Sequence, residues 1–374
     1  MRLVRVCLLC TEMFGVGHFG GFGRATRMIG RELARRGVAV TAVVPRRSTD
    51  WPVEFELDGI RVVQVPPGSP TRTIRRLRDV QADLFHSQEP STLTYLAQKA
   101  QPDRPSVVTF RDPLDRSGWW GELRRSSSKV GVLLYAAYID NPLVRRAVRR
   151  ATRHFCAAQF VGAIAQQKFR LQEQPTFLPS PIEVPAEAHK AELPTVCFVG
   201  RWHPRKRPEL FFELARKMPS VRFIAVGAAQ DPDRDRRLRA ACADVPNLEF
   251  PGVIDQFTSG ELQQILSESW VLVNCSHREG LPTAFAEAAA HGCAILACLD
   301  PDGFVSRFGR RVEADALQEG LEFLLEQDRW RALGEAGRAH VGAVFAAPES
   351  VSRHLDEYHA VLREVQEREE LGGA

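Results

Sequence analysis

Residues 271–287 have the sequence VLVNCSHREGLPTAFAE. The apolar run Val271–Asn274 predicts a β-strand, and Pro282–His291, which is followed by a glycine, predicts a helix. A strand that enters a helix through a loop leaves backbone N–H groups free at the helix start, where an anion is favoured. Glu279 before the helix and Glu287 inside it offer acceptors for ligand hydroxyl groups. The segment therefore predicts a site for a phosphorylated, diol-bearing ligand.

Strand-like runs alternate with amphipathic helical stretches along the whole chain, which is typical of parallel α/β sheets. A length of 374 residues indicates two domains. We therefore expect two doubly wound, Rossmann-like domains that face each other across a cleft. The stretch 111–153 shows no regular pattern. The predicted elements of the first half are strands 3–9, 38–44, 60–65, 83–86 and 106–110 and helices 24–36 and 91–100. Those of the second half are strands 195–199, 221–226, 247–250 and 271–274 and helices 208–218, 233–242 and 259–267.

A proline-rich segment marks the predicted domain boundary. Residues 179–185 (PSPIEVP) lead towards Pro194, after which a new strand pattern begins. We predict an N-terminal domain over 1–185, a linker over 186–194 and a C-terminal domain over 195–347. Residues 348–374 are predicted to form a terminal helix that packs back on the N-terminal domain.

The composition indicates a soluble globular protein. Charged residues make up 26% of the chain and the net charge is only +4, which does not favour nucleic acid as a partner. No apolar stretch approaches the ~20 residues of a membrane-spanning helix. The first residues predict a strand and show no signal-peptide cleavage pattern, so a cytoplasmic protein is expected. The eight cysteines are scattered in apolar contexts and are expected to be structural.

A second candidate site lies between a predicted strand and a predicted helix. Residues 200–207 (GRWHPRKR) follow strand 195–199 at the edge where parallel sheets bind ligands. An arginine offers a planar fork and a lysine a compact charge, a combination suited to a diphosphate. Arg201 and Lys206 are the candidate ligand-binding residues of this loop.

Together, the two segments resemble the family-4 glycosyltransferases of the GT-B type, which are retaining enzymes. The resemblance implies that Arg201 and Lys206 bind the diphosphate of a nucleotide-sugar donor and offset the charge of the leaving group without a metal. It implies that Glu279 contacts the donor sugar and that Glu287 binds the ribose diol. We expect the catalytic residues to be Glu279, Arg201 and Lys206. The donor site is expected to comprise Gly21, Phe22, Arg201, Lys206, Val253, Glu279, Gly280, Leu281, Pro282, Thr283 and Glu287.

The N-terminal domain carries weaker similarities to the same family. Gly20–Gly23 resembles the glycine loop that approaches the donor phosphates and the acceptor. Residues 107–113 (VVTFRDP) resemble a strand that usually ends in Thr-x-His-Asp, but this chain has Arg111 at the histidine position. Because arginine does not act as a base, Arg111 is expected instead to hold an anionic acceptor or a donor phosphate. Gly20 and Arg111 are the expected acceptor-side residues.

The predicted function is therefore retaining transfer of a sugar from a nucleotide diphosphate donor to an acceptor that the sequence does not identify. A nucleotide-sugar-binding protein without turnover is an alternative, motivated by Arg111. An NADP-dependent oxidoreductase is a weaker one, because 15–20 matches G-x-G-x-x-G and basic residues follow the second strand. No cofactor or metal is expected, since the D-x-D strings at 231–233 and 233–235 lie where helix caps are expected. The acceptor is expected to be a small molecule, a glycan or a lipid-linked molecule. Apolar, aromatic and basic residues within 119–150 predict possible peripheral contact with the inner face of a membrane.

Overall fold

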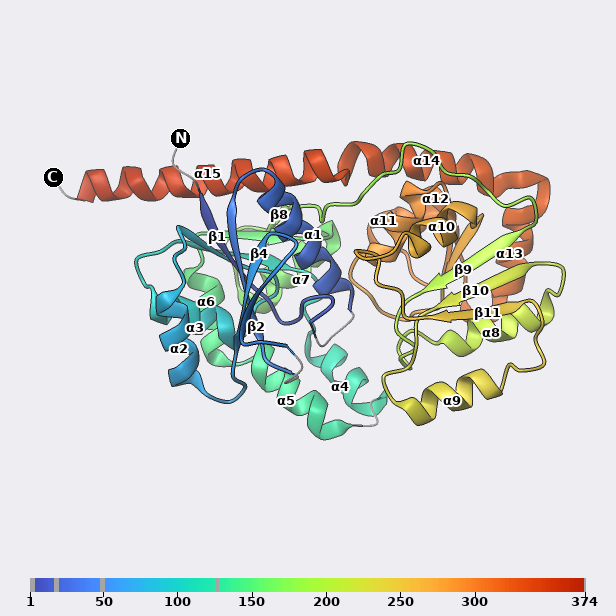
Figure 1. Cartoon of the computed structure of the whole chain (residues 1–374), viewed down its shortest axis with the longest axis horizontal. Coiled ribbons are helices and arrows are strands. Elements are labelled where there is room, and N and C mark those ends of the chain that lie inside the picture. Colours follow the sequence, from blue (N-terminus) through green and yellow to red (C-terminus); the bar gives the residue numbers. More distant parts are fainter. Residues whose placement is uncertain (1–3, 17–19, 48–50, 126–127, 373–374) are drawn as a thin grey trace. The chain divides into compact units, whose positions relative to one another are not determined.

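The computed structural model describes residues 4–16, 20–47, 51–125 and 128–372, and the chain forms two compact units (Figure 1). Unit 1 comprises Met1–Pro181 together with Ala347–Ala374, and unit 2 comprises Ile182–Ala346. The first change of unit falls after Pro181, whereas the sequence analysis placed the end of the N-terminal domain at residue 185. Each unit is a parallel α/β layer structure of the predicted class.

Unit 1 is built on an eight-stranded sheet with the order β3-β4-β2-β1-β5-β6-β7-β8. Its neighbouring strands are parallel except for the β3–β4 pair, which is antiparallel. The strand order reverses direction between β1 and β5. The strands are β1 (Arg5–Leu9), β2 (Ala39–Pro45), β3 (Glu54–Leu57), β4 (Ile60–Val65), β5 (Leu84–Ser87), β6 (Ser106–Phe110), β7 (Arg153–Cys156) and β8 (Thr176–Phe177).

Helices cover both faces of this sheet, because successive side chains of a strand point to opposite sides. Val6 and Leu8 of β1 pack in a core with residues of α1 and α15, whereas Cys7 and Leu9 pack with α2 and α3. The central strands are therefore apolar throughout. The helices of unit 1 are α1 (Gly21–Arg35), α2 (Pro70–Asp79), α3 (Thr92–Ala100), α4 (Arg116–Arg125), α5 (Lys129–Ile139), α6 (Pro142–Arg150), α7 (Gln159–Phe169) and α15 (Ala347–Gly372).

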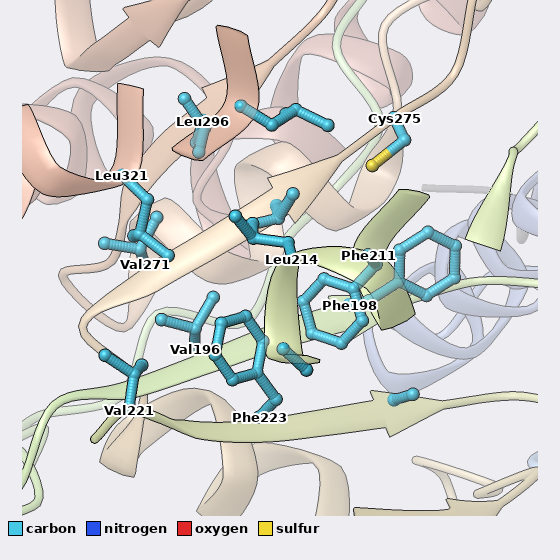
Figure 2. Packing of buried hydrophobic residues seen from close by; sticks show 14 of the residues in the cluster. Val196, Phe198, Phe211, Leu214, Val221, Phe223, Val271, Cys275, Leu296 and Leu321 are labelled. Carbon is cyan, nitrogen blue, oxygen red and sulfur yellow. The ribbon is translucent and has the colours of Figure 1, made fainter. Parts of the chain in front are cut away.

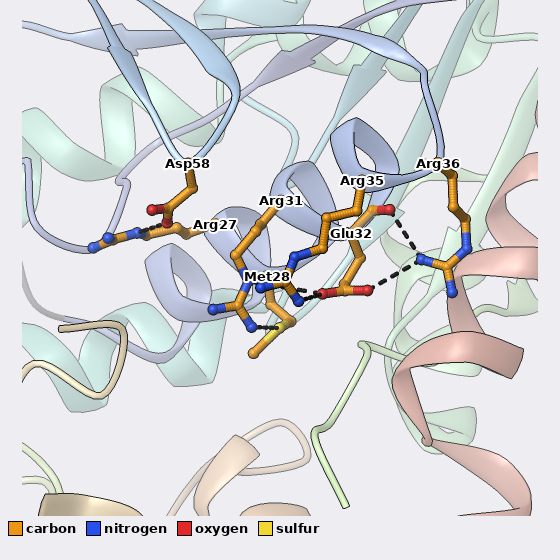
Figure 3. Close-up of polar contacts among 7 residues, drawn as sticks. All are labelled: Arg27, Met28, Arg31, Glu32, Arg35, Arg36 and Asp58. Atoms are coloured by element: carbon orange, nitrogen blue, oxygen red, sulfur yellow. Dashed lines mark hydrogen bonds and ion pairs between the residues drawn. The ribbon is translucent and has the colours of Figure 1, made fainter. Parts of the chain in front are cut away.

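Helix α1 is fixed to the sheet by ion pairs as well as by its apolar face (Figure 3). The buried side chain of Arg27 donates from Nε to Asp58 Oδ2 at 2.7 Å, in the turn between β3 and β4. Glu32 accepts from Arg35 at 2.7 Å and from Arg36 at 3.1 Å on the same helix. The Arg27–Asp58 pair joins the helix to the hairpin and so holds the glycine-rich start of α1 in place.

Helix α15 completes unit 1 although it follows unit 2 in the sequence. Val351, Tyr358 and Val361 are buried in the same core as β1 and α1. The Tyr358 hydroxyl lies 2.7 Å from His86 Nδ1, and His86 Nε2 lies 2.7 Å from Thr109 Oγ1, so both ring nitrogens of this buried histidine have partners. Burial and the nearby charges of His354 and Arg111 hold the pKa of His86 well below its usual value. The neutral ring therefore links α15 to β5 and β6.

Unit 2 is built on a six-stranded, all-parallel sheet with the order β11-β10-β9-β12-β13-β14. Three phenylalanines pack at the centre of one face of the sheet (Figure 2). The ring centroid of Phe211 lies 5.6 Å from that of Phe198 and 5.2 Å from that of Phe223. The strands are β9 (Thr195–Val199), β10 (Arg222–Val226), β11 (Leu248–Gly252), β12 (Val271–Asn274), β13 (Ala294–Ala297) and β14 (Gly309–Arg311). The helices are α8 (Pro208–Lys217), α9 (Pro232–Ala240), α10 (Glu261–Glu268), α11 (Thr283–Ala290), α12 (Phe304–Phe308), α13 (Leu317–Leu325) and α14 (Arg329–Val344), with 3₁₀ turns at Pro301–Gly303, Ala314–Ala316 and Glu326–Asp328.

Several sequence predictions differ from the structure in their details. The irregular region 111–153 contains three helices, α4, α5 and α6. Helix α1 begins at Gly21, three residues before the predicted start at 24. Strands β3, β7, β8, β13 and β14, which are two to four residues long, were not predicted. The G-x-G-x-x-G stretch lies partly outside the described residues, since 17–19 are not among them.

The His86–Tyr358 contact gives a stability prediction. Tyr358→Phe keeps the ring but leaves His86 Nδ1 without its partner in a buried site, so we expect a loss of about 1–3 kcal/mol in the free energy of unfolding. Urea denaturation followed by circular dichroism measures this loss. Tyr95→Phe, on the partly buried side of α3, is the matched control and should change stability by less than about 0.5 kcal/mol. Equal effects of the two substitutions would contradict the role assigned to the Tyr358 hydroxyl.

Candidate functional site

The candidate site of unit 2 lies where its strand order reverses. Strand β9 has β10 on one side and β12 on the other, and parallel sheets bind ligands at the carboxyl ends of strands at such a point. The loop 200–207 follows β9 and the loop 275–282 follows β12. Because β9 and β12 are adjacent and parallel, both loops leave the sheet at the same edge.

The two loops meet through an ion pair between predicted site residues. Lys206 Nζ contacts Glu279 Oε1, and the same carboxylate oxygen accepts a hydrogen bond of 2.7 Å from Ser276 Oγ. Both side chains are largely withdrawn from solvent, with exposed fractions of 18% for Lys206 and 10% for Glu279. The fold therefore brings together a cation and an acid that lie far apart in the sequence.

Backbone contacts fix the position of Lys206. Its N–H donates to the carbonyl of His203 at 2.8 Å, which closes a tight turn in the basic loop. The next residue, Arg207, has a left-handed backbone (φ 49°) and donates from Nε to the carbonyl of Cys275 at 2.5 Å. Pro208 then begins α8, where its missing N–H costs no hydrogen bond. Arg207 thus ties the loop after β9 to the loop after β12.

The site is electropositive around this pair. Burial and the neighbouring cations Arg205 and Arg201 lower the pKa of Lys206, although the Glu279 carboxylate acts in the opposite direction. Burial alone raises the pKa of Glu279, but Lys206 and Arg205 outweigh it and leave that pKa below its usual value. Two cationic side chains, Lys206 and Arg205, act on one carboxylate, so the loop carries more positive than negative charge.

Close backbone approach shapes the same edge of the sheet. Gly227 follows β10 with φ 132°, and a Cβ atom there would lie 2.0 Å from the carbonyl oxygen of Gly200. The N–H of Gly227 donates to the carbonyl of Gly252 at 2.7 Å, and the N–H of Trp202 donates to Ala228 at 2.9 Å. Only glycine fits at position 227, so the loops after β9, β10 and β11 lie directly against one another.

Helix α11 begins beside Glu279. Pro282 is its N-terminal cap residue and gives no side-chain hydrogen bond to the helix, so the first amides have no side-chain cap. Gly280, Leu281 and Thr283 lie in this turn, as the sequence predicted. Glu287 is half-buried one turn further along, in the same helix. The helix start and the Lys206–Glu279 ion pair therefore lie at the same edge of unit 2, and anion binding there stays a prediction.

Two other predicted donor-binding residues, Val253 and Arg201, are exposed. Val253 directly follows β11, which extends to Gly252, and is 52% exposed. The sequence predicted a strand over 247–250, and β11 extends two residues further, to Gly252. Arg201 is exposed at the start of the basic loop.

The glycine loop of unit 1 is occupied by a side chain of the protein. The N–H of Gly23 donates to Glu12 Oε1 at 3.0 Å, and a Cβ atom on Gly20 would lie 2.1 Å from the same oxygen. Gly20 is the N-terminal cap of α1, and Gly21 and Phe22 form its first turn. The carboxylate of Glu12 thus lies at the helix end where the sequence analysis expected donor phosphates.

Arg111 is buried and already engaged. Its guanidinium group donates from Nε and Nη2 to the carbonyl and side-chain oxygens of Gln88 at 3.0 and 2.7 Å, and from Nη1 to Ser180 Oγ at 2.8 Å. Burial lowers the pKa of Arg111 to about 10, although the charge of Glu89 acts in the opposite direction. These contacts support a role in holding the loop after β6, whereas the expected contact with an anionic acceptor stays a prediction.

The aspartates of the D-x-D strings serve mainly as caps and ion-pair partners. Asp231 caps α9 by accepting from the N–H of Asp233 at 3.0 Å, and Asp235 pairs with Arg239 at 2.7 Å. Asp300 accepts from the N–H of Val305 at 2.7 Å. Within the described part of the chain, no group of three or more His, Cys, Asp or Glu residues could hold a metal ion.

Sequence reasoning did not single out three residues of the site. Ser276 orients Glu279, Arg205 adds positive charge beside it, and Arg207 ties the two loops together. Arg205 and Arg207 stood within the predicted basic loop but were not distinguished from its other charges. Ser276 had no signal in the sequence, because a serine is common in any loop.

Two protein-family models match the chain. A glycosyl transferase 4-like domain matches residues 20–180, and a model for glycosyl transferases group 1 matches residues 193–327. Together they span most of the chain and both of its units. The chain belongs to the family-4-like glycosyltransferases of the GT-B fold.

Solved structures of other glycosyltransferases share the fold of this glycosyltransferase. Sucrose-phosphate synthase from Thermosynechococcus elongatus has a TM-score of 0.74 at 17% identity, over 96% of this chain and 100% of that one. HepE from Anabaena, solved with UDP-glucose, has a TM-score of 0.71 at 13% identity, over 95% and 99%. WaaG, involved in lipopolysaccharide biosynthesis, has a TM-score of 0.64 at 16% identity, over 92% and 97%. A sequence search of the curated proteins gives no match.

The ion pair of the glycosyltransferase can be tested by a double-mutant cycle of Lys206→Met and Glu279→Gln. We expect a coupling of about 1–3 kcal/mol in the free energy of unfolding at pH 7, because the two groups share a poorly solvated site. The pKa of Glu279 is lowered in the folded state, so the coupling should be present at neutral pH and be lost as the pH falls below about 4.

A second cycle on Arg311 and Glu313 provides the control. These side chains also form an ion pair in unit 2, but they are 49% and 69% exposed. Exposed pairs typically contribute below about 1 kcal/mol, so the control coupling should be the smaller of the two. Equal coupling in both cycles would show that the Lys206–Glu279 contact is an ordinary surface pair.

Proposed function

We propose that this glycosyltransferase transfers a sugar, with retention of anomeric configuration and without a metal ion, from a nucleotide diphosphate donor to a hydroxyl-bearing acceptor. The observation that carries the proposal is the Lys206–Glu279 pair at the strand reversal of unit 2, surrounded by excess positive charge. A neighbour of the same fold, HepE, was solved with UDP-glucose, which supports a nucleotide sugar as the donor.

In this proposal the diphosphate of the donor binds the basic loop. Arg201 and Lys206 contact the phosphate oxygens, and the amides of 280–283 at the start of α11 add dipoles directed at the anion. The lowered pKa of Glu279, which Lys206 and Arg205 cause against the effect of burial, supports an anion here because it indicates local positive charge. Fixed positive groups stabilise the charge that develops on the leaving nucleotide diphosphate. In metal-dependent enzymes a metal ion provides this stabilisation.

Glu279 has a second role once the donor is bound. When a phosphate oxygen replaces Glu279 as the partner of Lys206, the Glu279 carboxylate loses its ion pair. It keeps the hydrogen bond from Ser276 Oγ at 2.7 Å. It is then free to accept hydrogen bonds from hydroxyl groups of the donor sugar. Glu287, on the next turn of α11, binds the ribose diol.

The reaction proceeds on one face of the sugar. The bond from the anomeric carbon to the diphosphate oxygen breaks, and the acceptor oxygen forms its bond to the same face. The acceptor proton passes to the leaving phosphate oxygen, so no protein base is needed. The buried, hydrogen-bonded position of Arg111 is compatible with this scheme, because arginine offers no basic group.

The diphosphate contact gives a direct prediction. Arg201→Ala and Lys206→Ala should each weaken UDP binding by at least tenfold, since a charge-assisted contact contributes about 1.5–3 kcal/mol. Isothermal titration with UDP measures the loss, and donor turnover should fall with it. Arg237→Ala, on the exposed side of α9 in the same unit, is the control and should bind UDP as the unaltered protein does. Unchanged affinity in both loop variants would contradict the proposed diphosphate site.

A nucleotide-sugar-binding protein without turnover is the second candidate. Arg111 favours this alternative. Its guanidinium group is hydrogen-bonded within the protein, and it occupies the position where family-4 glycosyltransferases usually have a histidine. A panel of UDP, GDP, ADP and dTDP sugars distinguishes the two by a thermal shift and by release of the free nucleotide. Donor binding with neither transfer nor slow hydrolysis would favour the binding protein.

We also propose that α4, α5 and α6 contact an anionic membrane surface. Val130, Leu133 and Leu134 occupy one face of α5 at helical spacing and are 56–68% exposed, and Trp120 of α4 is 65% exposed. Residues 116–150 hold eight arginines and lysines against two carboxylates. Apolar side chains bordered by basic ones are typical of peripheral membrane contact. No helix in the described part of the chain is sufficiently long and apolar to span a bilayer.

Sedimentation with vesicles tests the membrane contact. The protein should bind vesicles of phosphatidylcholine and phosphatidylglycerol at a ratio of about 7 to 3 more tightly than pure phosphatidylcholine, because each basic residue adds about 1 kcal/mol near an anionic surface. Leu134→Glu should lower the partition coefficient at least tenfold, since burying a leucine contributes about 1.5–3 kcal/mol. Leu193→Glu, at an equally exposed leucine of unit 2, is the control. Binding that is the same in both variants would refute the contact.

A further inference from the structure

Unit 1 has its own ligand-binding edge, and the proposed donor contacts do not account for it. Its strand order reverses between β1 and β5, and ligands bind parallel sheets outside the carboxyl ends of strands at such a reversal. Glu12 lies three residues after β1, and Glu89 lies two residues after β5. Two carboxylates therefore flank the reversal, on loops that leave neighbouring, parallel strands.

Of the two acids, Glu89 is the more unusual, because it is buried and no cationic side chain of the described residues forms an ion pair with it. It is only 5% exposed, and its Oε2 accepts a hydrogen bond of 2.8 Å from the backbone N–H of Arg111. The guanidinium group of Arg111 is directed instead at Gln88 and Ser180. Across the described residues, Glu89 forms no ion pair within 4.0 Å, and only one of its two carboxylate oxygens has a hydrogen-bond donor.

A buried carboxylate in this state is costly unless another donor completes it. Burial raises the pKa of Glu89 to about 7, and the nearby charge of Asp112 acts in the same direction. The N–H of Arg111, its charge and the charge of Lys168 act in the opposite direction. Lys168 is itself paired with Asp140 at 3.0 Å, so it does not complete Glu89. An acid whose pKa is strongly shifted and that lies at a ligand-binding edge of a sheet is a candidate functional residue.

The surroundings of Glu89 indicate what kind of ligand fits. Tyr135 of α5 is 36% exposed, and partial burial and then the charges of Glu89 and Glu12 raise its pKa. Glu12 and Asp112 add negative charge, the guanidinium of Arg111 has its protein partners, and Arg47 donates to the carbonyl of Thr11 at 3.2 Å. An anionic ligand is disfavoured beside these carboxylates, and a neutral hydroxyl group supplies the donor that Glu89 lacks.

We propose that Glu89 binds a hydroxyl group of the acceptor, and that the acceptor part held by unit 1 is a neutral, polyhydroxylated molecule. This inference rests on the proposed glycosyl transfer and names the acceptor class of the same reaction. Glu89 binds and orients the acceptor, and the proton of the attacking hydroxyl still passes to the leaving phosphate. Arg111 is a positioning residue, because its backbone N–H fixes one carboxylate oxygen and its side chain fixes the loop. This proposal takes the acceptor to be neutral at Glu89, whereas the sequence analysis expected Arg111 to hold an anionic acceptor or a donor phosphate.

Glycoside titrations on the full chain test the proposal without requiring turnover. Methyl α-D-glucopyranoside, methyl α-D-mannopyranoside and glucose 6-phosphate serve as probes, with saturation-transfer NMR as the readout. At least one neutral glycoside should bind, and more tightly than the phosphorylated sugar. Its Kd should fall at least fivefold as the pH rises from 6 to 8.5, because the ionised carboxylate accepts the stronger hydrogen bond.

Glu89→Gln keeps an oxygen for the N–H of Arg111 and is expected to fold. It should weaken glycoside binding at least tenfold at pH 8.5 and remove the pH dependence, while Glu89→Asp should restore part of both. Glu56→Gln, at an exposed position of β3, is the control and should bind as the unaltered protein does. Titration with UDP reports separately on the donor site of unit 2 and should give the same Kd in all variants.

Three outcomes would overturn the acceptor site. These are binding of none of the neutral glycosides, tighter binding of glucose 6-phosphate, and a Kd and pH profile that Glu89→Gln leaves unchanged. Loss of UDP binding in the unaltered protein would instead overturn the donor site. The two proposals therefore fail by different measurements.

Discussion

Two loops of unit 2 are held together by the contact of Lys206 with Glu279, and the proposed chemistry depends on it. The residues are 73 positions apart, and only the pairing of β9 with β12 brings their loops to one edge of the sheet. In the unliganded protein each charge satisfies the other in a site that excludes most water. In the proposed function, a diphosphate offers Lys206 a partner with more charge, and the carboxylate then becomes available to sugar hydroxyls. The same proposal has one ion pair keep the site preorganised until the donor replaces it.

The sequence predicted the parts of this site that follow from chain order. A strand, a glycine-containing loop and a helix start are encoded within residues 271–291, and a basic loop between a strand and a helix is encoded within 195–217. Their meeting was not encoded in either segment, because it depends on the order of strands in the sheet. Ser276 and Arg207 gain their roles only from that meeting. The contact of Gly227 with the carbonyl of Gly200 is also a product of the fold, since a glycine after a strand has many uses.

The N-terminal unit was harder to predict, and the reason is physical. A guanidinium group at 111 has no basic form, so the sequence indicated an anion-binding role. The structure shows that neighbouring oxygens take its donors, and the nearby acid at 89 carries no motif by which to recognise it. The role of a buried polar residue depends on its neighbours. Those of Glu89 come from four separate segments of the chain. Helix α5 was missed because its sequence is apolar around almost the whole helix and lacks the usual alternation of apolar and polar residues.

Helix α15 has a consequence for how the protein is made. Unit 1 takes residues from both sides of unit 2, so in chain topology unit 2 is an insertion within unit 1. During synthesis the core around β1 and α1 stays open on the side that Val351, Tyr358 and Val361 later cover, while unit 2 already has all of its strands. Unit 2 can therefore complete its sheet before the core of unit 1 is able to close. Shortening the chain by its final helix would damage the half that is translated first.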